Sequence, residues 1–169
     1  MSHIDELIAE VCPRGVPHRT LSSVATLRRG TSITKKGLVP GDVPVIAGGR
    51  TPAYFHGVAN RSGQTIVVAG SGAYAGFVSW WEEDIFVSDA FSIVPSSPQL
   101  FAKYCFYWLS AKQAEIHAMK SGGGVPHVYT RDVEKLRIPV PPLEVQREIV
   151  RVLDQFTELE AELEAELEA

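Results

Sequence analysis

Short runs of apolar and β-branched residues dominate the middle of the chain and predict a sheet of short strands. Such residues are enriched in strands. The run at residues 65–69 is apolar almost throughout, which is typical of a strand buried on both faces. The predicted strands lie at residues 43–46, 65–69, 77–81, 85–87 and 90–94, and Pro95 closes the last of them.

Three other stretches have the spacing of helices. Residues 4, 7, 8 and 11 are apolar and fall on one face of a short helix that a proline and a glycine end. Residues 99–120 contain neither glycine nor proline and predict one long helix. After Pro141-Pro142 the chain again lacks both residues, and proline is tolerated in the first turn of a helix.

The last predicted helix carries the apolar seam of a coiled coil. Its seam residues follow alternating three- and four-residue steps. The helix is about 40 Å long, because each residue adds about 1.5 Å. It ends in a Glu-Leu-Glu-Ala repeat without lysines, so its glutamates have no basic neighbour four residues away, and we expect this end to need a partner. The seam residues are Ile149, Val152, Phe156, Leu159 and Leu163.

These patterns predict an α+β fold. We expect a β-rich domain with flanking helices over residues 1–140, followed by one long C-terminal coiled-coil helix over residues 141–169. A chain of 169 residues suffices for one domain with a proper core and one appendage. No apolar run approaches the roughly 18 residues of a membrane span, and the amphipathic start does not resemble a signal peptide. We therefore expect no membrane segment and a cytoplasmic protein.

The two cysteines and the histidines do not predict a metal site. Cys12 and Cys105 lie far apart in the sequence, and no cysteine or histidine pair has the spacing of metal ligands. Both cysteines are expected to be free thiols in a reducing compartment.

The charge of the chain is divided unequally between its two parts. The whole chain has a net charge of −4, but residues 144–169 contain nine acidic residues against Arg147 and Arg151, a net charge of −7. The preceding 143 residues therefore carry 14 basic against 11 acidic residues, a net charge of +3. A mildly basic domain permits a polyanionic partner without requiring one.

A glycine-rich loop, Gly70–Gly76, follows the first strand of the central region. A dinucleotide-binding loop needs a helix after it, whereas here a strand-like run follows. We therefore favour a tight hairpin whose small residues permit close approach of the backbone. A loop beside a bound macromolecule and a small-molecule site remain the alternatives.

Two further loops have the composition of anion-binding segments. Thr31–Lys36 is cationic and rich in hydroxyls, and two arginines precede it. Gly122–Gly124 could hold an anion on its backbone or simply form a flexible helix exit. A solvated surface loop is the alternative for the first segment. No nucleophile elbow is present, and no second carboxylate or histidine has a meaningful spacing from Ser88-Asp89, so no pattern indicates catalysis.

Several stretches together resemble the specificity (S) subunit of type I restriction–modification systems. The resemblance covers nearly the whole chain, and its most specific part is the junction Ile-Pro-Val-Pro-Pro-Leu-Glu at residues 138–144, followed by Gln146. The other matching segments are residues 27–35, 44–49, 68–76, 86–91 and 122–127, and the helix entry around residues 147–154.

The resemblance implies one target recognition domain followed by one conserved spacer helix. Such a domain reads half of a bipartite site in double-stranded DNA and is itself non-catalytic. It implies no cofactor on this chain, with S-adenosylmethionine and ATP/Mg on the methyltransferase (M) and restriction (R) subunits. It also implies a homodimer through an antiparallel coiled coil, if the chain is a half-subunit rather than part of a longer one. Location at the nucleoid would follow from DNA binding.

Cations, hydroxyls and aromatic residues in the polar loops are the candidate DNA contacts. The loops are Thr31–Lys36, Gly48–Tyr54, Gly70–Tyr74 and Gly122–His127. A coiled-coil assembly scaffold without sequence-specific DNA binding is the rival hypothesis. The candidate residues are Arg28, Arg29, Thr31, Thr34, Lys35, Lys36, Arg50, Tyr54, Arg61, Ser71, Tyr74, Lys120 and His127.

Overall fold

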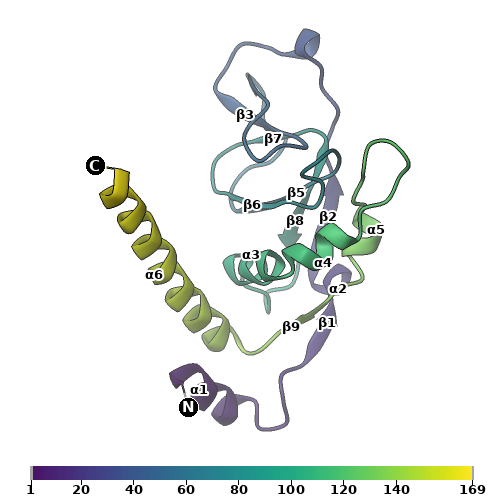
Figure 1. The fold of residues 1–169 in the computed structure, drawn as a ribbon. Coiled ribbons are helices and arrows are strands. Elements are labelled where there is room, and N and C mark those ends of the chain that lie inside the picture. Colours follow the sequence, from purple (N-terminus) through teal and green to yellow (C-terminus); the bar gives the residue numbers. More distant parts are fainter. Residues whose placement is uncertain (1, 169) are drawn as a thin grey trace.

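The computed structural model describes residues 2–168, which form a β-rich domain with a long helix leaning along one side (Figure 1). The helices are α1 (His3–Val11), α2 (Leu21–Val24), α3 (Ala102–Ala111), α4 (Gln113–Ala118), α5 (Thr130–Val133) and α6 (Leu143–Glu168), with a 3-10 turn η1 (Lys35–Gly37). The strands are β1 (His18–Thr20), β2 (Ala25–Arg29), β3 (Val43–Ile46), β4 (Tyr54–His56), β5 (Thr65–Ala69), β6 (Val78–Trp81), β7 (Phe86–Val87), β8 (Ala90–Pro95) and β9 (Arg137–Pro139).

The central sheet is antiparallel and has the order β2-β8-β5-β6. β5 and β6 form the predicted hairpin, with Val68 opposite Val78 and the glycine-rich loop between them. The Ala69 carbonyl accepts hydrogen bonds from the amide of Gly76, which has a φ of 88° that favours glycine. The hairpin interpretation of this loop is therefore confirmed.

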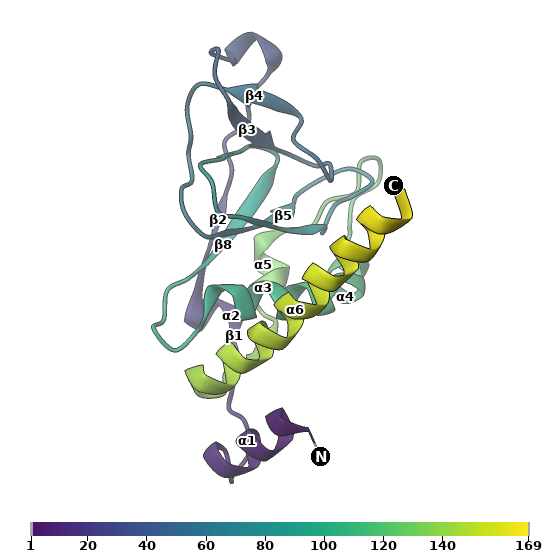
Figure 2. The ribbon, with the colours of Figure 1, turned by 90° about the vertical axis from the view of Figure 1, so that its left-hand side faces the viewer.

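Two smaller sheets extend the domain beyond the central one. β3 pairs with β4 antiparallel and with β7 parallel, and this sheet lies towards the end of the molecule that carries η1 (Figures 1 and 2). β1 pairs with β9 antiparallel, which brings residue 18 next to residue 139. The α+β prediction is confirmed.

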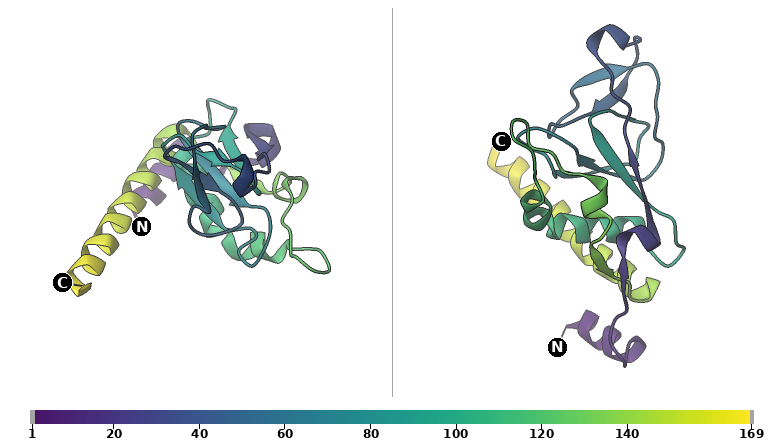
Figure 3. Two further views of the ribbon diagram at one scale, coloured as in Figure 1. Left: turned by 90° about the horizontal axis from the view of Figure 1, so that it is seen from above. Right: turned by 90° about the vertical axis from the view of Figure 1, so that its right-hand side faces the viewer.

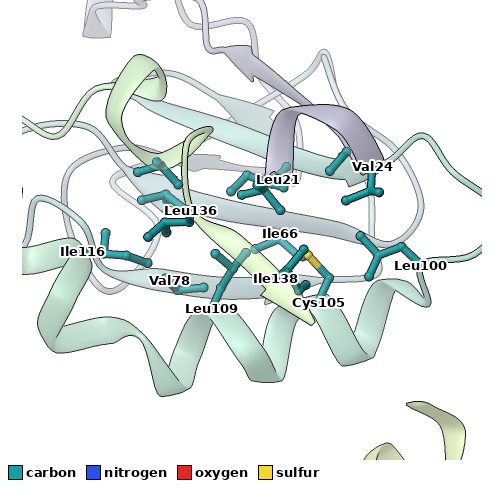
Figure 4. Close-up of a cluster of buried hydrophobic side chains, with 14 of the residues drawn as sticks. Leu21, Val24, Ile66, Val78, Leu100, Cys105, Leu109, Ile116, Leu136 and Ile138 are labelled. Carbon is teal, nitrogen blue, oxygen red and sulfur yellow. The ribbon is translucent and has the colours of Figure 1, made fainter. Parts of the chain in front are cut away.

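β5 is buried on both faces because two separate hydrophobic clusters flank it. Successive side chains of a strand point to opposite faces. Ile66 and Val68 face the main core with the helices, whereas Val67 packs in a smaller cluster with Ile46 and Ile85. In the main core, side chains from α2, α3, α4 and β9 converge on the sheet (Figure 4).

The single helix predicted over residues 99–120 is wrong in one respect: the chain forms α3 and α4, with a break at Lys112. The change of direction lets the Gln113 side chain hydrogen bond to the hairpin loop. Its amide nitrogen donates to the Gly76 carbonyl at 2.5 Å, and its oxygen accepts from the Val78 amide at 3.0 Å. These tertiary contacts accompany a break in a segment that has no helix-breaking residue.

The buried amide of Gln146 fixes the start of α6 to the domain. Its oxygen accepts a hydrogen bond from the Phe101 amide at 2.8 Å, and its nitrogen donates to the carbonyls of Gln99 at 2.7 Å and Pro141 at 2.8 Å. Gln146 is fully buried, yet its polar atoms are satisfied. Further along, α6 leaves the domain, and from residue 155 its side chains are exposed.

None of the helices in residues 2–168 combines the length and the apolar composition that crossing a membrane requires.

Candidate nucleic-acid interface

Two glycine-rich loops that are about 50 residues apart in the sequence lie against each other. Ser71 and Ser121 each pair with His127 as isolated antiparallel bridges. The Gly72 amide donates to the Pro126 carbonyl, and the Val128 amide donates to the Gly70 carbonyl, both at 3.0 Å. The hairpin loop and the Ser121–His127 loop therefore form one structural unit.

One further loop contacts this unit directly, because a Cβ atom on Gly48 would lie 2.5 Å from the Ser71 carbonyl oxygen. Another packs on the turn from β7 to β8, since a Cβ atom on Gly30 would lie 2.1 Å from the Ser88 carbonyl oxygen. That turn is linked to the unit, as the Gly70 amide donates to the Asp89 carbonyl at 3.1 Å. Only glycine fits at such contacts. The Ile33 amide also donates to the Ser88 hydroxyl at 3.3 Å. We call residues 28–36, 48–54, 70–76 and 120–131 the loop cluster, and it contains the four loops predicted from the sequence.

The loop cluster borders a polar groove of about 280 Å³. The groove lies between the end of β2, the turn from β7 to β8, and the segment that leads into α5. Arg29 and His127 were predicted contact residues. Ser32, which also lines the groove, lies in the predicted loop Thr31–Lys36. The sequence interpretation missed four other polar residues of the lining, Asp89, Tyr129, Thr130 and Arg131.

Three side chains at alternating positions of the chain, 127, 129 and 131, form a stack beside the groove. The His127 and Tyr129 rings are nearly parallel, with 13° between their planes and 5.8 Å between their centroids. The Arg131 guanidinium lies 4.6 Å from the centre of the Tyr129 ring. The signal in the sequence is an aromatic residue and a cation at alternating positions after the glycines.

Two predicted cations of the loop cluster that do not line the groove each lie close to an aromatic ring. Lys35 in η1 lies 5.6 Å from the centre of the Tyr54 ring, and Arg50 lies 5.3 Å from that of Phe77. These cations are exposed. The predicted residues Arg28, Thr31, Thr34, Lys36 and Tyr74 are exposed as well, and Tyr74 lies in the hairpin loop.

Arg61 is engaged inside the protein. Its guanidinium donates to the Ser92 hydroxyl at 2.7 Å and to the carbonyls of Asn60, Arg28 and Arg29 at 2.8, 3.2 and 3.0 Å. Desolvation, with a smaller contribution from the charge of Arg28, lowers the pKa of Arg61. These contacts favour a structural role, in which Arg61 links the loop before β5 to the end of β2.

Two further predicted contacts also have partners within the chain. The Ser71 hydroxyl donates to the Asp89 carboxylate. The Lys120 ammonium donates to the Ala73 carbonyl at 3.0 Å, which ties the end of the α4 segment to the hairpin loop. DNA contact by these residues stays a prediction, and their observed hydrogen bonds stabilise the loop cluster.

The predicted coiled-coil seam divides into two parts. Ile149 packs against the core and Val152 is half-buried. In contrast Phe156, Leu159 and Leu163 are 61%, 54% and 59% exposed, an apolar stripe on the free half of α6. The C-terminal end of α6 and the Ser121–His127 loop lie on opposite sides of the domain (Figures 1 and 3). The protein thus has two separate candidate surfaces.

Comparisons with known proteins agree in pointing to one family. A family model described as type I restriction modification DNA specificity domain matches residues 13–169. The specificity subunit of the type I restriction enzyme MjaVIII of Methanocaldococcus jannaschii is 30% identical over 94 residues, which cover 56% of this chain and 22% of that protein.

Two solved structures share the fold. The S subunit of a type I restriction-modification system from M. genitalium has a TM-score of 0.76 at 24% identity, over 85% of this chain and 39% of that one. The HsdS subunit from Thermoanaerobacter tengcongensis has a TM-score of 0.68 at 22% identity, over 96% of this chain and 44% of that one. The chain therefore spans less than half the length of these relatives.

Proposed function

The chain belongs to the family of type I restriction modification DNA specificity domains, and on this premise we propose that it recognises one half of a bipartite sequence in double-stranded DNA. The observation that carries the proposal is the loop cluster. Four loops from distant parts of the sequence are fixed through backbone contacts, three of them to one another and the fourth through the turn from β7 to β8, and they present exposed cations beside a polar groove.

The cations of the loop cluster suit two kinds of DNA contact. Flexible exposed lysines such as Lys36 suit phosphate oxygens, which position a protein on the duplex without reading its sequence. Arginines presented by a fixed backbone suit base edges, because the planar guanidinium can donate two parallel hydrogen bonds to guanine. The net charge of +3 over residues 1–143 is consistent with a polyanionic partner.

Chemistry in such a complex would belong to partner subunits. We propose that the chain docks a methyltransferase subunit and a restriction subunit, which would carry S-adenosylmethionine and ATP with Mg²⁺. On this proposal the chain itself is non-catalytic and binds no cofactor. Purified chain should then methylate no DNA when S-adenosylmethionine is supplied, and methylation should require the added methyltransferase subunit.

α6 is the proposed assembly element. Pairing with a second, antiparallel helix would cover Phe156, Leu159 and Leu163. It would also set the six glutamates between residues 158 and 168 beside the start of the partner helix, where Arg147 and Arg151 lie. At 26 residues the helix is about 39 Å long, close to the roughly 34 Å of one DNA turn, so paired domains would meet half-sites about one turn apart.

Selection from a random duplex library tests the DNA-reading proposal. The full chain, with methyltransferase subunit added, is mixed with the library, and bound duplexes are sequenced over several rounds. We expect enrichment of one short motif. Enrichment of no motif, at any salt concentration that permits binding, would count against sequence recognition.

A coiled-coil scaffold without sequence-specific DNA binding is the second candidate, and the exposed apolar stripe favours it. It predicts concentration-dependent oligomers with no preference among duplexes. Light scattering at several protein concentrations, measured with and without DNA, separates this candidate from the first.

A further inference from the structure

Arg131 is an exposed arginine whose position is fixed although its hydrogen-bond donors are free. Its side chain is 71% exposed, and within residues 2–168 its guanidinium donates no hydrogen bond. The neighbouring Asp132 carboxylate lies 3.9 Å from Nε, too far for a hydrogen bond. An exposed ion pair of this kind contributes at most about 1 kcal/mol. The contact that orients Arg131 is instead the Tyr129 ring, 4.6 Å from its guanidinium.

The ring under Arg131 is itself held by a fixed backbone. Tyr129 stacks on His127, whose backbone pairs with Ser71 and with Ser121. The His127 ring also hydrogen bonds through Nδ1 to the Val125 carbonyl at 2.8 Å. The arginine therefore stands at the end of a stack that is anchored to the central hairpin.

The guanidinium lies over the Tyr129 ring, and its N–H donors meet no acceptor within hydrogen-bond distance among residues 2–168. The N–H groups of arginine lie in the plane of the group and form a fork that matches two acceptors at once. By contrast, Arg61 has already donated four hydrogen bonds to acceptors of its own chain. Arg131 thus has the geometry of an arginine prepared for an external planar partner.

Charges of both signs lie near Arg131. Asp132 is next to its guanidinium, and both Asp89 and Arg29 line the same groove. The choice of a base over a phosphate therefore rests on the fork of donors, which matches two acceptors on one base edge. In the major groove, the O6 and N7 atoms of guanine are the acceptors that a bidentate arginine contacts most often.

We propose that Arg131 reads a guanine of the DNA target through a bidentate contact, and that Tyr129 is the positioning residue that holds its guanidinium. The inference rests on the proposed function, because it assigns one base contact within a sequence-reading surface. It adds a residue from α5 to the candidate contacts of the loop cluster.

The test compares the motifs that wild-type protein and variants select from a random duplex library. The variants are Arg131→Ala, Arg131→Lys and Tyr129→Leu, each as the full chain with methyltransferase subunit added. Arg14→Ala is the matched control, since Arg14 is exposed and follows α1 in the sequence. α1 lies at the opposite end of the molecule from the sheet of β3 and β4 (Figure 2). Thermal unfolding of each variant verifies that it is folded.

At one motif position we expect Arg131→Ala to lose a guanine preference of about 10- to 100-fold. Arg131→Lys keeps the charge but lacks the fork, so it should lose most of the same preference, and Tyr129→Leu should weaken it. Arg14→Ala should select the wild-type motif. An unchanged motif for folded Arg131→Ala would overturn the inference alone, as would an equal loss of affinity for all sequences. Wild-type protein that selects no motif would overturn both the inference and the proposed function.

Discussion

Replacing Gln146 by leucine should destabilise the protein strongly, although the substitution leaves the charge unchanged and alters the side-chain volume little. The substitution removes three hydrogen bonds at a fully buried position. Each is worth about 0.5–1.5 kcal/mol net, and the Phe101 amide would additionally lose its partner inside the protein. We expect the free energy of unfolding to fall by about 3 kcal/mol. For a chain of this size that lowers Tm by about 6–12 °C.

The assay is urea unfolding at 25 °C, followed by tryptophan fluorescence, with Gln155→Leu as the control. Gln155 lies on the same helix but is exposed, and among residues 2–168 its side chain accepts a single hydrogen bond, from Arg151 at 3.3 Å. This control should change the unfolding free energy by no more than about 0.5 kcal/mol. If Gln146→Leu behaves like the control, the amide does not hold α6 to the domain and the reasoning is refuted.

Four further predictions follow from particular contacts. Gly30→Ala should lower the free energy of unfolding in urea by more than 1 kcal/mol, because the new Cβ would lie 2.1 Å from the Ser88 carbonyl oxygen. Gly124→Ala is the control and should change stability little, since among residues 2–168 no atom lies within 4 Å of the position of its Cβ. Burial raises the pKa of the Cys105 thiol to about 12, so at pH 8 a thiol reagent should modify Cys12 quickly and Cys105 only after denaturation. Arg61→Lys should lower the free energy of unfolding by roughly 1–3 kcal/mol, because one ammonium cannot replace the four hydrogen bonds of the guanidinium. Unchanged urea unfolding of this variant would refute the structural role of Arg61. Leu163→Glu should leave unfolding of the isolated chain nearly unchanged but abolish any dimer seen by light scattering, and a persisting dimer would exclude α6 as the interface.

The strands of the centre were predictable because burial on both faces leaves a clear mark in the sequence. The β5 run lies between two hydrophobic clusters, so nearly every position in it is apolar. β1 has no such mark, since His18 and Arg19 are exposed and the strand exists only through pairing with β9, more than 100 residues away. The break between α3 and α4 was hidden for a similar reason, because hydrogen bonds from Gln113 to the hairpin accompany it.

The loops of the candidate site were predictable, but the roles of individual side chains within them were not. Glycines and cations indicated the four loops of the loop cluster. Arg61 and Arg131 look equivalent in the sequence, where both are cations in polar segments. In the structure Arg61 donates to the carbonyls of Arg28 and Arg29, whereas the Arg131 guanidinium lies over the Tyr129 ring. The difference depends on which carbonyls, distant in the sequence, lie close to each guanidinium in space, and only the folded chain determines that.

The central claim, sequence recognition by the loop cluster, is tested most directly by one ratio of affinities. Duplexes that carry the selected motif and duplexes of the same length with that motif scrambled are titrated with the full chain and methyltransferase subunit at several salt concentrations. Phosphate contacts weaken both duplexes alike as salt rises, whereas base contacts distinguish them. We predict tighter binding of the motif duplex, by at least about 1,000-fold near physiological salt. Equal affinities across the salt series would contradict the claim.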